Sequence, residues 1–386
     1  MSQLIPLTEE QREVQTLARD FATAEIAPHA ARWDREACFS VGVARRMGEL
    51  GFLGMLIPER YDGLGLDTTS YLLALEEIAA ADASAAVLMS VHNSLPTQML
   101  LAFGNDEQKE RFLRPMARGE LIGAFALSEP DAGSDASALR CQATRDGDDW
   151  VLNGTKSWVS SGSFADVIMV MARTDTPDAR RRSKGISAFI VTPDLPGFHV
   201  GKKEDKMGLR ASPTVQLNFD GLRVPAENLL GEEGQGFVYA MRSLDNGRMG
   251  IAAQALGIGR AALDAALDYA AERKQFGQPI REFQAIQFKL ADMASRLASA
   301  SAMLHLTAAA KDRGESTTLY GSMSKLLASE TAMYVTTEAV QIFGGYGYVK
   351  DYPVEKYFRD AKITEIYEGT SEIQRIVIAR ELYANR

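Results

Sequence analysis

One carboxylate near the carboxyl end of the chain has neighbours that suit acid–base chemistry. The segment 366–370, IYEGT, places Glu368 between an aromatic residue and a glycine, directly before a predicted helix that Thr370 or Ser371 would cap. A carboxylate acts as a general base when its surroundings raise its proton affinity toward the working pH. Taken alone, such a residue is more often a solvated loop acid. The segment therefore nominates Glu368 as a base and leaves the solvated role open.

Two other segments have the composition of ligand-binding loops. Residues 125–135, FALSEPDAGSD, follow a predicted strand and offer hydroxyls and backbone N–H groups to a polar ring or a phosphate. Residues 341–348, QIFGGYGY, end a predicted helix with glycines that let a ligand approach the backbone closely. Singly, the first is more often a surface turn and the second a helix C-cap.

Familiar nucleotide and metal signatures are missing or misplaced. Residues 257–262, GIGRAA, formally match G-x-G-x-x-A, but they lie inside a helical run with no strand before them. Close helix packing explains these small residues better than a dinucleotide fingerprint. The four histidines are isolated, and Cys38 and Cys141 are far apart, so we predict no metal site and no disulfide framework. This cysteine usage favours a reducing compartment.

Charge and hydropathy exclude two classes of partner. With 42 Lys and Arg against 51 Asp and Glu, the net charge is −9 and no basic cluster forms, so a nucleic-acid partner is not expected. The most apolar stretch, residues 297–310, contains serines and a histidine and is predicted to be a buried helix, so no membrane association is expected. The first residues have no secretory signal, so the expected location is the cytoplasm, with a processed mitochondrial matrix form left open.

The length of the chain requires more than one packed unit. A single core stops growing near roughly 250–300 residues, and this chain has 386. Helical periodicity covers residues 8–118, short β-branched and aromatic runs cover residues 121–231, and alanine-rich helical periodicity returns from residue 237. We therefore predict an α+β fold with an N-terminal all-α domain (residues 1–120), a middle β-sheet domain (121–232) and a C-terminal four-helix bundle (233–386).

Local signals place many of the elements. Thr8 and Gln11 match a capping box at the start of the first helix. The pair Asn153 and Gly154 predicts the tight turn of a hairpin between residues 150–152 and 155–159. Further strands are predicted at 167–172, 186–191 and 214–219, and helices at 70–81, 87–103, 250–273, 283–311, 320–343 and 371–383.

Taken together, five segments resemble the acyl-CoA dehydrogenase family in order and spacing, and the resemblance covers essentially the whole chain. They are FALSEPDAGSD, WVSSG, the helix from LDNGR to ERKQFG, QIFGGYGY and IYEGTSEIQR. The resemblance implies the same α, β, α order that the periodicity predicts independently. It also implies an FAD cofactor held without a Rossmann fold.

The resemblance assigns residues to the flavin. Phe125, Leu127, Ser128, Trp158 and Ser160 would meet the isoalloxazine. Arg273 would contact the pyrophosphate, Phe276 and Gln284 would hold the adenosine end, and Thr370 and Glu372 would complete the site. In the family, residues matching Arg273 and the segment with Gln341, Gly344 and Gly345 serve the flavin of a neighbouring subunit, so a homotetramer is implied.

The implied reaction removes two hydrogens across Cα–Cβ of an acyl-CoA thioester. By resemblance, Glu368 takes the α-proton while the β-hydrogen leaves as hydride to flavin N5, and the product is a trans-2-enoyl-CoA. The backbone N–H of Glu368 and a ribityl hydroxyl would stabilise the enolate oxygen. Some members carry the base on the preceding long helix, but the matching position here is Gly247, which leaves Glu368 as the only placement.

The resemblance also indicates the substrate. Ser134, Asp245 and Arg248 match positions that bind the CoA portion, although Arg248 could be a plain exposed helix charge, and Gly369 adjoins the base. Gln254 and Thr364 match residues that narrow the acyl pocket in short-chain members. Short branched (isobutyryl-type) members stay open as an alternative, whereas residues 85–90 lack the arginine of glutaryl-type members.

Two rival functions remain at this stage. An acyl-CoA oxidase would share the flavin and the base but pass electrons to oxygen, and such chains normally carry a large extra C-terminal domain. A non-catalytic helical scaffold would need none of these residues and would purify colourless. For a dehydrogenase, the family implies electron-transfer flavoprotein as the electron acceptor.

Overall fold

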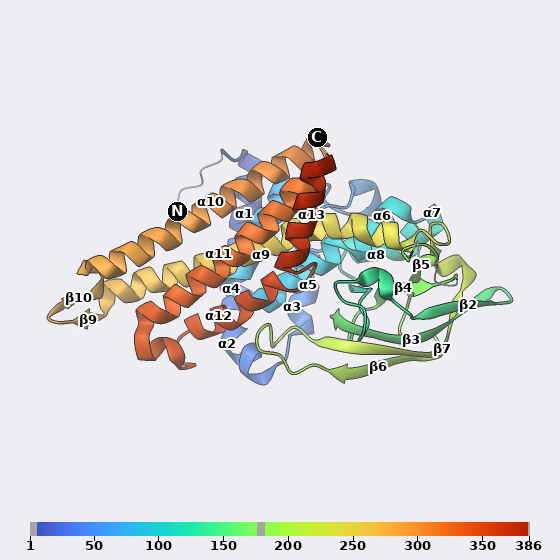
Figure 1. Ribbon diagram of the computed structural model, residues 1–386, viewed down its shortest axis with the longest axis horizontal. Coiled ribbons are helices and arrows are strands. Elements are labelled where there is room, and N and C mark those ends of the chain that lie inside the picture. The colour runs from blue at the N-terminus through green and yellow to red at the C-terminus, as the bar shows by residue number, and fades with distance from the viewer. Residues whose placement is uncertain (1–5, 176–181, 385–386) are drawn as a thin grey trace.

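The computed structural model describes residues 6–175 and 182–384. Eight helices come first, a sheet follows, and long helices complete the described chain (Figure 1). The N-terminal helices are α1 (Glu9–Phe21), α2 (Ala27–Glu36), α3 (Val41–Glu49), α4 (Thr68–Ala81), α5 (Ala83–Ser94), α6 (Pro96–Phe103), α7 (Asp106–Gln108) and α8 (Arg114–Ala117). The predicted capping box is confirmed, because Gln11 N donates to Thr8 Oγ1 at 3.1 Å and Thr8 N donates to Gln11 Oε1 at 3.0 Å.

The middle of the chain forms one eight-stranded sheet. Its strands are β1 (Gly123–Ala126), β2 (Gln142–Asp146), β3 (Asp149–Ser160), β4 (Val167–Arg173), β5 (Ile186–Val191), β6 (Phe198–Lys203), β7 (Thr214–Pro225) and β8 (Leu229–Leu230). Their order is β6-β7-β3-β2-β4-β5-β8, with β1 parallel to β4 beside this path. Alternate residues of β4 enter two different hydrophobic clusters, so this strand is buried on both faces.

The predicted hairpin at Asn153 and Gly154 is wrong. Strand β3 runs straight through this pair, and the hairpin turn lies earlier, between Asp146 and Asp149. A register shift between β3 and β7 falls at residues 152–154, and Gly154 has a φ of +147°. A Cβ atom there would lie 2.9 Å from the Cα atom of Cys141. The glycine therefore serves a β-bulge with close backbone approach, a use of glycine that the same letters allow.

The C-terminal helices follow the predicted order, and the first of them is longer than predicted. They are α9 (Gly236–Glu272), α10 (Gln284–Asp312), α11 (Thr318–Phe343), α12 (Val354–Lys362) and α13 (Ser371–Ala384), with a short hairpin, β9 (Lys274–Gln275) and β10 (Gln278–Pro279), between the first two. Helix α9 begins 14 residues before the predicted start at residue 250, because buried packing holds a glycine-containing stretch helical. Helix α12 was not predicted, and the predicted helix 87–103 is divided at Leu95, before Pro96.

Helix α9 is the central element of the fold. It packs against α4 and α5 on one side and against α10, α11 and α12 on the other. Gly257 lies in its interior, where a Cβ atom would be 2.4 Å from the carbonyl oxygen of Glu76 on α4. This contact supports close helix packing as the role of the GIGRAA segment. Residues of α9 can therefore meet both the N-terminal helices and the segment that carries Glu368.

Candidate active site

Glu368 is held between a short 3₁₀ turn, Ile363–Glu365, and helix α13. Its backbone has a φ of +53°, a left-handed conformation that is uncommon for a residue with a Cβ atom. Both carboxylate oxygens are shielded from solvent, and neither has a hydrogen-bond partner in the described part of the chain. A buried acceptor without a partner is costly in a folded protein. This carboxylate is therefore poised to receive a ligand, and the solvated loop role is wrong.

Gly247 on α9 makes room for that carboxylate. A Cβ atom built on Gly247 would lie 2.0 Å from Glu368 Oε2, far inside van der Waals contact. Residue 247 on α9 thus faces the carboxylate of Glu368 directly. A side chain at residue 247 would therefore displace the Glu368 carboxylate from its present position.

Burial raises the pKa of Glu368 to about 7. The ammonium of Lys325 and the guanidinium of Arg248 act in the opposite direction but do not cancel the effect of burial. A carboxyl with this pKa is close to half ionised at neutral pH. It is a far stronger base than a solvated glutamate and is still available in its ionised form.

Gly250 and Gln254 follow Gly247 on the same face of α9. Three residues along, a Cβ atom at Gly250 would lie 2.5 Å from Ser90 Oγ and 3.1 Å from the Tyr71 hydroxyl. Four residues further, the Gln254 amide donates from Nε2 to the carbonyl oxygen of Ala83 at 2.8 Å and accepts a hydrogen bond from the Tyr367 hydroxyl. Gln254 is fully buried. This face therefore runs from the carboxylate at Gly247 to a closed end at Gln254.

Thr364 and Gly369 lie close to Glu368 in the sequence. Thr364 is fully buried and donates from Oγ1 to the carbonyl oxygen of Ala361 at 2.7 Å. Gly369, with a φ of +90°, follows the base directly. The structure thus brings Glu368, Gly247, Gln254 and Tyr367 together.

Arg248 is buried rather than an exposed helix charge. Its guanidinium pairs with Asp245 at 2.7 Å and donates to Ser322 Oγ at 3.0 Å. Its Nε atom is buried and has no hydrogen-bond partner within the described ranges. Ser134, by contrast, is exposed in the loop after β1.

The segment after β1 and the end of β3 form a second cluster. Ser157 N donates to the carbonyl oxygen of Ser128 at 2.9 Å, which joins the segment that holds Phe125 and Leu127 to the strand that holds Ser160. Between Lys156 and Val159 the register with β7 shifts, and Trp158 has a φ of +61° and is 62% exposed. Such a bulge redirects a side chain away from the strand. An uncovered indole beside backbone and hydroxyl donors fits a planar, hydrogen-bonding ring such as a flavin.

Six other predicted flavin residues lie around the β9–β10 hairpin, at the start of α10 and at the end of α11. Phe276, in the β9–β10 hairpin, is 94% exposed, and the Arg273 guanidinium lies 5.4 Å from the centre of the Tyr346 ring. Figure 1 shows this hairpin at the end of the long helices that is distant from the sheet. Gln284 begins α10, Gln341 lies in the last turn of α11, and Gly344 and Gly345 follow it. The hairpin lies far from β3, the strand that carries Trp158 (Figure 1).

Thr370 and Glu372 flank the start of α13. Thr370 Oγ1 accepts a hydrogen bond from Ile373 N at 3.3 Å, so Thr370 caps this helix. Glu372 is exposed in the first turn.

Three buried residues near these clusters were not predicted from the sequence. Glu129 accepts hydrogen bonds from Arg140 N, Cys141 N and the Lys156 ammonium, the last at 2.7 Å, and so fixes the loop after β1. Lys325 and Gln374 donate to the backbone around Glu368. Glu129 lies inside the quoted FALSEPDAGSD motif, so its position was a usable signal. Gln374 lies inside the quoted IYEGTSEIQR motif, so its position was also a usable signal, whereas Lys325 lies in ordinary helical sequence and gave none.

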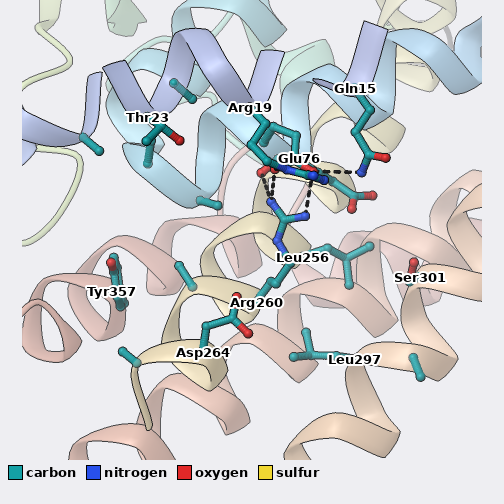
Figure 2. A pocket seen from close by; sticks show the side chains of 18 of the residues that line it. Gln15, Arg19, Thr23, Glu76, Leu256, Arg260, Asp264, Leu297, Ser301 and Tyr357 are labelled. Atoms are coloured by element: carbon teal, nitrogen blue, oxygen red, sulfur yellow. Dashed lines mark hydrogen bonds and ion pairs between the residues drawn. The ribbon is translucent and has the colours of Figure 1, made fainter. Parts of the chain in front are cut away.

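A separate cavity of about 900 Å³ lies between α1, α4, α9 and α10 (Figure 2). Arg19 and Arg260 both pair with Glu77 in its wall, at 2.9 and 2.6 Å. None of the predicted site residues lines it. The cavity is therefore distinct from the region beside Glu368.

Residues 6–175 and 182–384 contain neither a metal-binding cluster nor a membrane-spanning helix. Within these ranges no group of three His, Cys, Asp or Glu residues lies close enough together to hold a metal ion. No helix in these ranges is both long and apolar enough to span a bilayer.

The three-part fold and the buried carboxylate agree with comparisons to known families. Family models described as "Acyl-CoA dehydrogenase, N-terminal domain", "middle domain" and "C-terminal domain" match residues 8–120, 124–222 and 234–383. The chain belongs to the acyl-CoA dehydrogenase family, and it is an oxidoreductase of that class. Its fold of a helical domain, a sheet domain and a second helical domain is the one predicted from the sequence.

Individual relatives are similar over nearly the whole chain. The mouse (Mus musculus) protein named "Short-chain specific acyl-CoA dehydrogenase, mitochondrial" is 51% identical over 98% of this chain and 92% of its own length. The butyryl-CoA dehydrogenase from Megasphaera elsdenii is 45% identical, with a TM-score of 0.96 over 98% of this chain and 99% of that one.

Two further solved structures bear on the electron acceptor. One, described as an electron transferring flavoprotein of Acidaminococcus fermentans, contains a chain that is 46% identical, with a TM-score of 0.95 over 98% of this chain and 99% of that one. The prolyl acyl carrier protein oxidase AnaB is 35% identical, with a TM-score of 0.93 over 98% of this chain and all of that one. An oxidase therefore exists at this length, and chain length does not separate oxidases from dehydrogenases.

Proposed function

We propose that this protein is an FAD-dependent dehydrogenase of short-chain acyl-CoA, with Glu368 as the base and a trans-2-enoyl-CoA as product. The observation that carries the proposal is the shielded, unpartnered carboxylate of Glu368, which faces Gly247. The names of the mouse and Megasphaera relatives, which specify short-chain and butyryl-CoA substrates, support the substrate class.

In this proposal Glu368 removes the α-proton of the thioester. The acidity of that proton is too low for a solvated carboxylate, so the raised pKa of Glu368 matters. The backbone N–H of the same residue is assigned to the thioester oxygen, where negative charge develops as the proton leaves. The left-handed backbone of Glu368 therefore sets the direction of two functional groups at once.

FAD, when bound, supplies the acceptor for the β-hydrogen, which leaves as hydride. We assign Phe125, Leu127, Ser128, Trp158 and Ser160 to the flavin ring, with Thr370 and Glu372 nearby. Arg273, Phe276, Gln284, Gln341, Gly344 and Gly345 are assigned to the flavin of a neighbouring subunit. The distance of the β9–β10 hairpin from the sheet (Figure 1) supports that division.

The substrate's CoA portion is assigned to Ser134, Asp245 and Arg248, and its acyl end to Gln254, Thr364 and Gly369. We keep residues 1–120, 121–232 and 233–386 as the domain boundaries. Electron-transfer flavoprotein is the proposed acceptor.

A panel of straight and branched acyl-CoAs, assayed with a dye acceptor, tests the proposed function. We expect the highest kcat/KM with butyryl-CoA. A preference for isobutyryl-CoA would favour the short branched-chain alternative. Because the chain is also similar to the oxidase AnaB, the assay includes a test for oxidase activity. Steady hydrogen peroxide formation without dye, at the rate seen with dye, would select the oxidase.

The closed end at Gln254 predicts a short acyl optimum. In an open pocket each methylene would add up to about 0.8 kcal/mol of binding, and kcat/KM would rise with chain length. Against packed side chains, extra methylenes cost about 1–3 kcal/mol. We therefore expect a steep decline from butyryl-CoA to octanoyl-CoA, and we expect Gln254→Gly to move the optimum to longer chains.

Gln254→Leu is the matched control for this change. Leucine removes both hydrogen bonds of the amide but retains most of its volume, so the optimum should stay short even if the rate falls. Wild-type protein that prefers octanoyl-CoA would overturn the short-chain assignment and leave the family unchanged.

The cross-subunit assignment predicts a defect in flavin binding from a residue far from the base. Arg273→Ala should lower FAD occupancy, because a charge-assisted hydrogen bond contributes about 1.5–3 kcal/mol, roughly a tenfold to hundredfold change in Kd. Arg281→Ala is the control, since Arg281 is an exposed neighbour that pairs only with Glu282 among the described residues. Absorbance at the flavin band, measured during size-exclusion chromatography, reports the FAD occupancy, and the elution volume reports the oligomeric state. A wild-type monomer with one FAD per chain would contradict the assignment.

A further inference from the structure

The backbone turn at Glu368 needs outside support. Glu368 and Gly369 have φ values of +53° and +90°, so two successive residues are left-handed. The Cβ atom of an L-residue is crowded in this region, so Glu368 stays there only if surrounding groups fix the turn.

Two buried side chains from different helices provide this support. The Gln374 amide, on α13, donates from Nε2 to the carbonyl oxygen of Glu368 at 3.2 Å and to that of Gly369 at 2.9 Å. The Lys325 ammonium, on α11, donates to the carbonyl oxygen of Gly369 at 2.8 Å. A Cβ atom on Gly369 would lie 2.7 Å from Gln374 Nε2, so glycine allows this approach. The two helices pack side by side (Figure 1).

Lys325 is a buried cation that a purely structural role does not require. It is fully buried, and its hydrogen bond in the described ranges goes to a neutral carbonyl rather than to a carboxylate. Buried cations are normally paired with an opposite charge. Burial lowers the pKa of Lys325 to about 8, and the Glu368 carboxylate is the charge that most favours its protonated form. Conversely, Lys325 is the charge that most favours the ionised form of Glu368.

We propose that Lys325 is a positioning residue for the Glu368 base. With Gln374 it holds the carbonyl groups of the left-handed turn, so that the carboxylate faces Gly247, and its positive charge favours the ionised form of that carboxylate. The inference rests on the proposed function, in which Glu368 is the base.

Most other titratable groups around Glu368 and Lys325 do not change protonation state near pH 7. Arg248 on α9 stays protonated. Burial raises the pKa of Tyr71, on α4, and of Tyr367, so both remain neutral. The pKa of Glu372 is lowered, mainly by hydrogen bonds, and Glu365 pairs with Lys362 at 2.5 Å. Among the described groups named around this pair, Glu368 and Lys325 are therefore the ones with a pKa between about 6 and 8.

The test measures kcat/KM for butyryl-CoA against pH, with a dye acceptor and FAD-saturated protein. Lys325→Met removes the charge and the hydrogen-bond donor. The acidic limb of the pH profile of kcat/KM should therefore move upward by about one pH unit, which is a roughly tenfold loss of kcat/KM at pH 6. Lys325→Arg retains the charge and should leave the limb in place. Gln374→Leu removes two hydrogen bonds without a charge, so kcat should fall with no shift of the limb.

Lys206→Met is the matched control. Lys206 is another desolvated lysine with a pKa lowered to about 8 and a backbone carbonyl partner, that of Ser212, but Glu368 is not among the charges that act on it. Its limb should remain at the wild-type position. A flavin-loaded Lys325→Met protein with the wild-type limb would overturn the proposal. If Lys325→Met does not fold, an upward limb in Lys325→Arg would overturn it. Full turnover by Glu368→Gln would instead overturn the proposed function.

Discussion

Glu368→Gln is expected to abolish turnover and to leave flavin binding intact. Glutamine is nearly the same size but cannot accept the α-proton, and the described groups around it offer no second base: Gly247 has no side chain, and Lys325 and Arg248 are cationic. General-base catalysis contributes about 10²–10⁴-fold, and the loss here should reach or exceed the upper value. Rapid mixing of the variant with butyryl-CoA should fail to bleach the flavin absorbance.

The pH dependence of the wild-type protein provides a second readout. Since the ionised carboxylate is the active form and its pKa is raised to about 7, kcat/KM should rise with pH through about 7 and level off above it. Glu365→Gln, three residues earlier, is the control and should retain both the rate and the limb. Bleaching of Glu368→Gln at the wild-type rate would show that another residue is the base.

Gly247→Ala should also remove most activity, although it adds a single methyl group. The new Cβ atom would lie 2.0 Å from Glu368 Oε2, so the carboxylate must move. A displacement of about 1 Å from productive geometry can cost roughly 10²-fold in rate. Alanine is favoured over glycine inside a helix by about 1 kcal/mol, so thermal unfolding should show little or no loss of stability.

Gly321→Ala separates the steric effect from the helical one. Gly321 is a buried glycine of α11 whose added Cβ atom would be 3.9 Å from its nearest neighbour, an ordinary contact. It should gain stability and retain activity. A Gly247→Ala enzyme with wild-type kcat and an unmoved pH limb would show that the carboxylate acts from another position.

Sequence periodicity predicted the order of the elements well because the long helices and buried strands have strong apolar patterns. The strand predicted at 186–191 coincides with β5 (Ile186–Val191). The errors concern residues with more than one physical use. Asn153 and Gly154 are typical of a tight turn, yet the contact with Cys141 uses that glycine in a bulge. The glycines near residue 250 weaken the helical pattern, while tertiary packing keeps α9 continuous.

The site divides in a similar way. The motif around Glu368 indicated the carboxylate. Its burial and its left-handed backbone, however, depend on contacts with residues of α9, α11 and α13, which the motif alone does not reveal. Lys325 could not be predicted, because a lysine in a helix is normally exposed. The outward turn of Trp158 depends on a register shift between β3 and β7, which no local signal reveals.

The hydrogen bond between Tyr367 and Gln254 links chain-length preference to the base. Tyr367 directly precedes Glu368, and its hydroxyl donates to the amide at the closed end of the acyl region. If a smaller residue replaces Gln254 and admits longer acyl chains, the Tyr367 hydroxyl loses its hydrogen-bond acceptor, and Tyr367 is the residue directly before the base Glu368. Substitutions at 254 and 367 should therefore show strong epistasis, with the single change at 254 less fit than the pair.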